Sequence, residues 1–333
     1  MPTSNMVGDE QRLNVAVWGL GAHAFKNVLP AIAASVAAKL VGVYSREEAS
    51  CRRAGAEFSC GWWSDAASML ADDRVNAVYL ATPIGLHFEQ GMNVLSSGRH
   101  LICEKSLTDA YDKSIHLVVE ARRRRLILCE AFMYRFHPRI RSVFELVRRE
   151  EFGALVAVTC NFFLPELERP GYRYTASLGG GAFLDAGCYP ISLISGFNVE
   201  PLSVSQARFH HKPGIEVNTS GLAVLQWGVR GQAYLGWGYG AAYRNEATII
   251  GERQSLYIDQ VFAKGGSRCT QVLLRDVHGK EEQRNCETAD GFVEMLAYAQ
   301  KALFNEQMKE TLWGEAAQQA KLMEQVRALA IRD

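Results

Sequence analysis

The chain has 333 residues, of which 48% are apolar and 22% charged, an ordinary composition for a folded protein large enough to form two domains. Its 36 basic and 36 acidic residues balance, which excludes a bulk electrostatic partner such as nucleic acid or an acidic membrane surface. The eight cysteines include no Cys-x-x-Cys pair, no histidine cluster has zinc-ligand spacing, and no apolar stretch approaches the ~20 residues of a membrane span. We therefore expect a metal-free, cytoplasmic protein.

Residues 1–135 alternate between short apolar runs and helical patterns. The apolar runs lie at residues 14–18, 39–44, 77–81, 100–103 and 126–129, and helical patterns separate them, for example at 25–37, 66–71 and 86–96. This rhythm predicts a Rossmann domain, which is a doubly wound parallel sheet with helices on both faces. The basic run 122–125 closes a helical pattern and is expected to be a solvated helix end.

A glycine-rich turn directly follows the first apolar run. It has the pattern Gly-x-Gly-x-x-Ala and consists of Gly19, Leu20, Gly21, Ala22, His23 and Ala24. Gly19 permits the tight turn, Gly21 lets the backbone approach a pyrophosphate, and Ala24 is a small-residue replacement for the third glycine of the dinucleotide-binding fingerprint. The turn therefore predicts a bound dinucleotide cofactor.

The residues after the second apolar run indicate which dinucleotide is bound. NAD-binding folds usually place an acidic residue there, against the adenosine ribose. Ser45 and Arg46 occupy this position, and a hydroxyl beside a guanidinium suits a 2′-phosphate. We expect NADP(H) in preference to NAD(H). The alternative is that Glu47 binds the ribose and Arg46 is only solvated.

Residues 136–333 show a different pattern. After a helix expected at 140–149, alternating apolar runs lie at 156–163, 203–209, 222–227, 232–239, 247–250, 254–258 and 270–275. They predict a substrate-binding and oligomerisation domain of the α+β class with a large, mostly antiparallel open sheet. Two helices, at about 291–304 and 311–331, close the chain, and the last helix is a candidate to pack back on the first domain.

Polar residues end two of the strands expected in the first domain. Thr82-Pro83 and Glu104-Lys105 should face the cofactor at the carboxyl edge of the parallel sheet. At these residues the chain resembles the Gfo/Idh/MocA family of glucose–fructose oxidoreductases and inositol dehydrogenases. Members of that family carry Ala-Thr-Pro-x-x-x-His and then Glu-Lys-Pro at this spacing, and His87 stands at the histidine position.

The resemblance extends over nearly the whole chain. Segment 131–140, AFMYRFHPRI, is similar to the segment that joins the two domains in the family, and 178–194 is similar to its motif Gly-Gly-Gly-x-x-x-Asp-x-Gly-x-[His/Tyr]. Asp185 is the acid of this motif and Tyr189 its last residue. The tyrosine version resembles the branch that includes deoxysugar 3-ketoreductases and the xylose and dihydrodiol dehydrogenases. One departure is Ser106, which replaces the usual proline.

A lysine and a tyrosine are the expected catalytic pair. Hydride transfer to or from a carbinol carbon requires a proton donor within reach of the oxygen. We expect Tyr189 to be that donor, with Lys105 binding the same oxygen and lowering the tyrosine pKa from its usual value near ~10. Glu104 is expected to orient Lys105 or the nicotinamide amide. The alternatives are a plain Glu104–Lys105 ion pair and a tyrosine that only fills the core.

Three further residues complete the candidate site. Asp185 is expected to fix a substrate hydroxyl, although an acid there could instead cap a helix expected at 187–194. By the resemblance, Arg173 lies close to the cofactor or substrate, and the alternative is a solvated loop charge. His87 is counted among the cofactor-contacting residues as a support rather than as an acid or base.

These residues predict an NADP(H)-dependent oxidoreductase that reduces a keto-sugar, with nucleotide linkage, reacting carbon and direction left open. The alternatives are an NAD(P)-dependent dehydrogenase of a free sugar or dihydrodiol, and a non-catalytic dinucleotide-binding sensor or regulatory protein. The resemblance also implies a homodimer or homotetramer built on the second-domain sheet. We expect Val224, Trp227, Tyr234 and Trp237 to supply the apolar face of that sheet.

Overall fold

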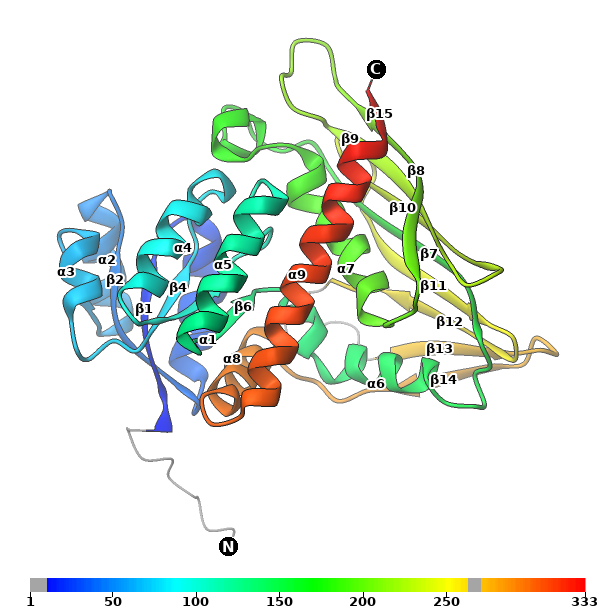
Figure 1. Cartoon of the computed structure of the whole chain (residues 1–333), viewed down its shortest axis with the longest axis horizontal. Coiled ribbons are helices and arrows are strands. Elements are labelled where there is room, and N and C mark those ends of the chain that lie inside the picture. The colour runs from blue at the N-terminus through cyan, green and yellow to red at the C-terminus, as the bar shows by residue number, and fades with distance from the viewer. Residues whose placement is uncertain (1–10, 263–270, 333) are drawn as a thin grey trace, which may run out of the picture.

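Two β-sheets organise the computed structural model of the chain, which describes residues 11–262 and 271–332 (Figure 1). In the described residues the first sheet is parallel and has the strand order β3-β2-β1-β4-β5-β6. Its strands are β1 (Leu13–Trp18), β2 (Ala38–Tyr44), β3 (Gly61–Trp62), β4 (Ala77–Leu80), β5 (His100–Cys103) and β6 (Leu128–Glu130). The strand order reverses between β1 and β4, and in open parallel sheets such a reversal creates a ligand crevice at the carboxyl ends of the strands.

Helices cover both faces of this sheet. They are η2 (Ala24–Val28), α1 (Leu29–Ala34), α2 (Glu48–Phe58), α3 (Ala66–Ala71), η3 (Ile84–Leu86), α4 (His87–Ser96) and α5 (Tyr111–Arg124). Val15 and Val17 pack into one hydrophobic cluster, whereas Ala16 and Trp18 pack into another on the opposite face. The predicted doubly wound Rossmann sheet is therefore confirmed. The basic run is also exposed at the end of α5, as predicted.

The second sheet is mixed but mostly antiparallel. In the described residues its order is β14-β13-β12-β11-β7-β10-β9-β8-β15, with parallel pairing only between β10 and β7 and between β15 and β8. Its strands are β7 (Leu155–Leu164), β8 (Leu202–His210), β9 (Ser220–Trp227), β10 (Gly231–Tyr239), β11 (Arg244–Gly251), β12 (Gln254–Asp259), β13 (Gln271–Asp276), β14 (Glu281–Asn285) and β15 (Ala330–Arg332). The predicted large open sheet is confirmed.

Helical segments join the sheets and cover one face of the second. They are η4 (Met133–Phe136), α6 (Pro138–Val147), η5 (Tyr172–Tyr174), η6 (Ala176–Leu178), η7 (Phe183–Gly187), α7 (Cys188–Gly196), α8 (Gly291–Ala302) and α9 (Glu306–Leu329). The long helix α9, red in Figure 1, lies between the sheets and contacts both domains. Its Trp313 belongs to the first-domain core and donates a hydrogen bond from Nε1 to the Leu126 carbonyl at 3.0 Å.

The face of the second sheet predicted for oligomerisation needs a correction. Trp227 and Trp237 are 7% and 0% exposed, because they point toward the helices on the covered face. Tyr234 is 48% exposed, and Val224 is partly exposed on the same open face. Side chains alternate along a strand, so residues three positions apart cannot share a face. Leu222, which is 43% exposed, belongs with Tyr234 instead.

Other differences from the sequence predictions are local. Strand β14 was not predicted, because all five of its residues are polar and exposed, as suits an edge strand. The strand predicted at 270–275 is described from Gln271 onward, and position 270 lies outside the described residues. The cysteines within the described ranges are all free. No helix in those ranges is long and apolar enough to cross a membrane.

Candidate active site

The glycine turn between β1 and η2 has the shape that a dinucleotide needs. Gly19 has φ +105°, and a Cβ there would lie 2.7 Å from the Ala81 carbonyl oxygen, so only glycine fits. Gly21 has no heavy atom within 4 Å of a Cβ position, which leaves its backbone open to a ligand. Ala24 is buried and closes the helix against the sheet. The turn therefore fits a pyrophosphate passing over the end of β1.

The end of β2 presents the residues predicted to choose between NADP and NAD. Arg46 is exposed, and among the described residues its guanidinium has no ion-pair partner. The Glu47 carboxylate instead accepts a hydrogen bond from the Ser50 hydroxyl at 2.6 Å, and the Ser45 hydroxyl accepts one from the Glu47 amide at 3.4 Å. The Arg46 guanidinium is therefore available to bind a phosphate, whereas the Glu47 carboxylate already accepts a hydrogen bond.

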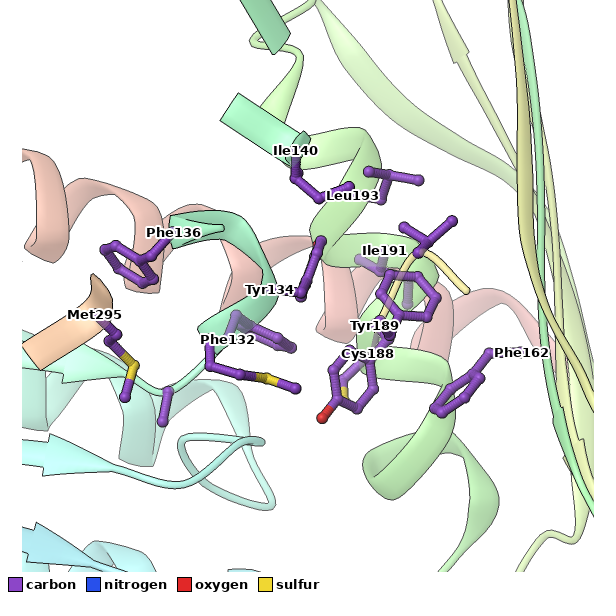
Figure 2. Packing of buried hydrophobic residues seen from close by; sticks show 14 of the residues in the cluster. Phe132, Tyr134, Phe136, Ile140, Phe162, Cys188, Tyr189, Ile191, Leu193 and Met295 are labelled. Atoms are coloured by element: carbon purple, nitrogen blue, oxygen red, sulfur yellow. The ribbon is translucent and has the colours of Figure 1, made fainter. Parts of the chain in front are cut away.

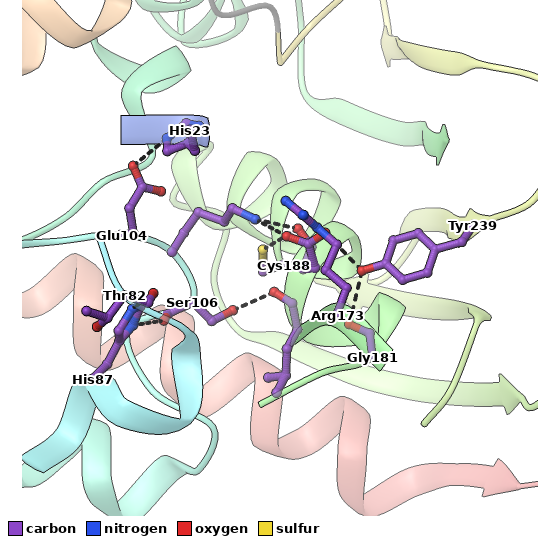
Figure 3. Close-up of polar contacts among 12 residues, drawn as sticks. His23, Thr82, His87, Glu104, Ser106, Arg173, Gly181, Cys188 and Tyr239 are labelled. Carbon is purple, nitrogen blue, oxygen red and sulfur yellow. Dashed lines mark hydrogen bonds and ion pairs between the residues drawn. The ribbon is translucent and has the colours of Figure 1, made fainter. Parts of the chain in front are cut away.

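Lys105 and Asp185 form a buried ion pair between the two domains (Figure 3). Lys105 comes two residues after β5, and its Nζ donates to Oδ1 and to the carbonyl of Asp185, both at 2.7 Å. Arg173 Nε donates to Asp185 Oδ2 at 2.7 Å, and the Tyr239 hydroxyl donates to the same oxygen at 2.9 Å. The Lys105 side chain is 11% exposed and that of Asp185 is 7% exposed. One carboxylate thus organises two cations and a phenol.

The charges of this pair stabilise each other. Burial alone would raise the pKa of Asp185, but Lys105 and Arg173 hold it well below its usual range. Burial alone would lower the pKa of Lys105, but the Asp185 carboxylate keeps it well above its usual range. Lys105 is therefore an ammonium ion at any physiological pH. The plain Glu104–Lys105 ion pair considered from the sequence is not formed.

Asp185 does not cap the helix that follows it. It lies inside the π-helical turn η7, and α7 begins after Gly187 without a side-chain cap. The alternative role of Asp185 as an N-cap is therefore wrong, because its side chain points away from the α7 amides toward Lys105 and Arg173.

Tyr189 stands at the start of α7 and lies close to Phe132 and Phe162 (Figure 2). The Lys105 Nζ lies 5.0 Å from the centre of the tyrosine ring, and Phe132 and Phe162 make edge contacts at 5.6 and 5.2 Å between ring centres. Burial raises the pKa of Tyr189, and Lys105 lowers it only in part. The net direction differs from the sequence prediction because burial of the phenol raises its pKa more than the Lys105 charge lowers it. The phenol is therefore protonated.

Glu104 faces the glycine turn rather than the lysine. Its Oε1 accepts from the Tyr79 hydroxyl at 2.7 Å and contacts His23 Nε2 at 2.8 Å. Burial would raise the pKa of Glu104, but His23 and its hydrogen bonds lower it to about 2. The carboxylate therefore connects the turn predicted to hold the cofactor to the strand end that carries Lys105.

His87 and Ser106 fix the loops around the lysine. The two His87 ring nitrogens face the carbonyls of Thr82 at 2.8 Å and Ser106 at 3.0 Å, and burial lowers the pKa of His87. The Ser106 hydroxyl donates to the Leu184 carbonyl at 2.9 Å, a bond that the usual proline could not make. Pro83 begins the turn η3 next to this loop. His87 thus joins the loops that follow β4 and β5, and its predicted contact with the cofactor stays a prediction.

Tyr239 is a site residue that was not predicted from the sequence. It is the last residue of β10, and it is 3% exposed. A tyrosine at the end of an alternating strand is most simply interpreted as a core residue, and nothing in its neighbourhood in the sequence indicates the bond to Asp185.

A dinucleotide turn and a lysine–tyrosine pair at the carboxyl edge of a Rossmann sheet are typical of oxidoreductases that use a nicotinamide cofactor. Comparison with known families supports this class. Residues 13–132 match the family described as "Oxidoreductase family, NAD-binding Rossmann fold", and residues 140–257 match the "GFO/IDH/MocA C-terminal domain". The chain therefore belongs to the Gfo/Idh/MocA family, as predicted.

Individual relatives are similar over most of the chain. The dTDP-3,4-didehydro-2,6-dideoxy-alpha-D-glucose 3-reductase of Saccharopolyspora spinosa is 32% identical over 250 residues, 75% of each protein. The enzyme of the same name from Actinomadura kijaniata is 30% identical over 318 residues, 95% of each. Among solved structures, KijD10, a 3-ketoreductase from Actinomadura kijaniata in complex with NADP and TDP-benzene, superimposes with a TM-score of 0.89 at 28% identity, covering 96% of this chain and 98% of that one.

Proposed function

We propose that this chain is an NADP(H)-dependent ketoreductase acting on a nucleotide-linked keto-sugar. The observation that carries the proposal is the Lys105 ammonium, held 2.7 Å from Asp185 and beside Tyr189 at the carboxyl edge of the dinucleotide-binding sheet. The relatives named above as dTDP-sugar 3-reductases, and the neighbour solved with NADP and TDP-benzene, support the same reaction class. A non-catalytic sensor would have no need for an intact lysine–tyrosine pair.

The residues present fit the cofactor. In this proposal the turn Gly19–Ala24 holds the pyrophosphate, Ser45 and Arg46 bind the 2′-phosphate, and Thr82, Pro83 and Glu104 border the nicotinamide end. The open backbone at Gly21 and the exposed, unpaired Arg46 support this assignment within the described residues. When bound, NADPH supplies the hydride.

Lys105 and Tyr189 act on the reacting oxygen. An ammonium ion has three N–H donors, and Lys105 uses two of its donors on Asp185, so the third can bind the substrate carbonyl oxygen. That charge stabilises the negative charge developing on the oxygen. Tyr189, protonated at neutral pH, then gives its proton to the same oxygen.

Asp185 serves chiefly to position the lysine. Three of the roughly four acceptor sites of its carboxylate are occupied, by Lys105, Arg173 and Tyr239, which leaves about one site for a substrate hydroxyl. Arg173 is 37% exposed and so presents charge toward the opening of the site. We therefore assign Asp185 and Arg173 to holding Lys105 and orienting the sugar.

A second group of charges supports a nucleotide-linked substrate over a free sugar. Tyr174 packs 5.9 Å from Tyr239 between ring centres, and the guanidinium of Arg169 lies 5.2 Å over Tyr174. Arg169 and Lys212 both pair with Glu166, so this exposed group carries a surplus positive charge. Together with Arg173, it forms a cationic border suited to a diphosphate.

A substrate screen tests the proposed function directly. NADPH loss at 340 nm is followed with nucleotide-linked 3-keto and 4-keto sugars, with free keto-sugars and with buffer alone. We expect turnover with a nucleotide-linked sugar and little with its free counterpart. Equal rates with the free sugar would remove the nucleotide from the proposal, and no turnover with any keto-sugar would overturn it.

Charge variants test the nucleotide assignment separately. Lys212→Ala should weaken binding of the nucleoside diphosphate about tenfold, whereas Glu166→Gln should strengthen it, because the change releases Arg169 and Lys212. Lys280→Ala, in the turn between β13 and β14, is a matched control. Unchanged affinity in both variants would exclude this border from substrate recognition.

Assembly, domain division and location belong to the same proposal. We assign residues 1–135 to the cofactor domain and 136–333 to the substrate domain, in a cytoplasmic enzyme. We further propose that the open face of the second sheet, with Leu222 and Tyr234 43% and 48% exposed, pairs two copies of the chain.

A further inference from the structure

A small cavity lies directly behind the catalytic lysine loop. It measures about 20 Å³, room for about one water molecule, and Ser106, Leu107, Glu130, Leu184 and Gln319 line it. These residues come from four places: the loop after β5, the end of β6, the turn that carries Asp185, and helix α9. The cavity is thus the rear wall of the candidate site.

Two polar side chains reach the catalytic segments from this wall. Glu130, at the end of β6, accepts a hydrogen bond from the Leu107 amide at 2.8 Å, two residues after Lys105. Gln319 donates from Nε2 to the carbonyl of Cys188 at 3.0 Å, one residue before Tyr189. Gln319 is 2% exposed, and its Oε1 has no partner in the described residues. A buried amide oxygen at a water-sized cavity is the usual place for a bridging water.

We propose that Glu130 and Gln319 are positioning residues that hold Lys105 and Tyr189 in register from behind, joined by a water molecule in the cavity. The inference rests on the proposed function, because it takes Lys105 and Tyr189 as the reacting pair. A backbone shift of about 1 Å at such groups is enough to slow chemistry strongly. Neither side chain faces the substrate, so both act on turnover and not on binding.

Variants separate this role from a structural one. Glu130→Ala and Gln319→Met should each lower kcat about tenfold while the KM values for NADPH and the keto-sugar stay within about twofold. Glu130→Gln keeps an acceptor for the Leu107 amide and should retain most of the turnover. Glu151→Gln and Gln307→Ala, at exposed positions, are matched controls.

The pH profile supplies a second readout. Glu130→Gln removes the ionisation of Glu130 and of no other residue in the wall. A step in kcat near neutral pH that depends on Glu130 should therefore disappear in this variant. The groups around Glu130 that can also titrate or carry charge are Lys105, Arg135, Glu315, Cys103, Cys129, Cys188, Tyr111, Glu324 and Arg327. All of these remain in the variant.

The outcomes distinguish the two proposals. A wild-type chain that reduces no keto-sugar overturns the proposed function. An active wild type whose Glu130→Ala and Gln319→Met variants unfold at the wild-type temperature and keep kcat within twofold overturns only the positioning role. If Glu130→Ala fails to fold, the pH profile of Glu130→Gln decides. Loss of the kcat step near neutral pH supports the positioning role of Glu130, and an unchanged profile overturns it.

Discussion

Replacing Tyr189 by phenylalanine tests its proposed role as the proton donor. The substitution keeps the ring between Phe132 and Phe162 and removes only a hydroxyl, which makes no hydrogen bond to a described residue. The free energy of unfolding should therefore change by less than about 0.5 kcal/mol, and NADPH affinity should not change. The ring is 4% exposed, so a water molecule has little room to replace the lost donor. Turnover should fall by about 10²–10⁴-fold, or roughly 3–5 kcal/mol in the barrier.

The assay measures kcat from NADPH oxidation across pH, with cofactor binding and thermal unfolding measured in parallel. Lys105→Met is the comparison, because it removes the charge proposed to stabilise the oxygen. Near wild-type turnover in Tyr189→Phe, with a large loss in Lys105→Met, would refute the donor role and leave the lysine with water as the proton source. A parallel loss of stability would show that the hydroxyl belongs to the fold.

Four further predictions follow from the same contacts. Arg46→Ala should weaken NADPH binding ten- to a hundredfold and leave NADH binding nearly unchanged, as titration of each cofactor would show. Asp185→Asn leaves two cations without their anion and should lower the free energy of unfolding by about 3 kcal/mol. Because the pKa of Asp185 is lowered in the folded state, the stability that its carboxylate contributes is present above pH ~4 and is lost as the pH falls below it. Burial raises the pKa of Glu130 to about 7, so the native state loses stability as the pH rises from about 4.5 to 7, and Glu130→Gln should melt higher than wild type at pH 8 but not at pH 4. Tyr234→Glu should disrupt the proposed pairing of two copies, so that light scattering gives the mass of a monomer.

Each of these has a contrary result. If Arg46→Ala weakened the binding of NADPH and NADH equally, Arg46 would not bind the 2′-phosphate, and Glu47 would be the residue expected to bind the ribose. An Asp185→Asn variant with wild-type stability would mean that solvent compensates the two cations. If Glu130→Gln and the wild type melted at the same temperature at both pH values, the raised pKa would not belong to Glu130. An unchanged mass for Tyr234→Glu would show that the open face of the sheet does not form the interface.

Most of the fold could be predicted from periodicity because its strands are apolar and its turns are marked by glycine. Strands β1 and β5 were predicted to within one residue, since both are buried on two faces and read as continuous apolar runs. Strand β14 could not be predicted, because an exposed edge strand of polar residues has no apolar pattern. The prediction for Trp227 and Trp237 was wrong because side chains alternate along a strand, which places both on the covered face.

The site residues that stand in local sequence motifs could be predicted. The contacts that depend on packing between distant parts of the chain could not. Lys105 and Asp185 stand in recognisable motifs, but their direct pairing joins residues 80 positions apart. Tyr239 and Gln319 belong to a strand and a helix whose patterns serve the core equally well. Their hydrogen bonds exist only because the second sheet reaches η7 and α9 reaches the start of α7.

The position of Trp313 has a consequence for synthesis of the protein. This side chain, 1% exposed, completes the hydrophobic core beneath β6 and α5, although about 180 residues separate it from them in the chain. Domains commonly fold from the N-terminus as they leave the ribosome. Because Trp313 is part of the first-domain core, we expect that core to remain incomplete, with apolar side chains exposed, until α9 has been made. Nascent chains stalled before residue 306 should therefore bind chaperones or proteases that recognise these exposed side chains, and chains stalled far enough beyond residue 329 should not.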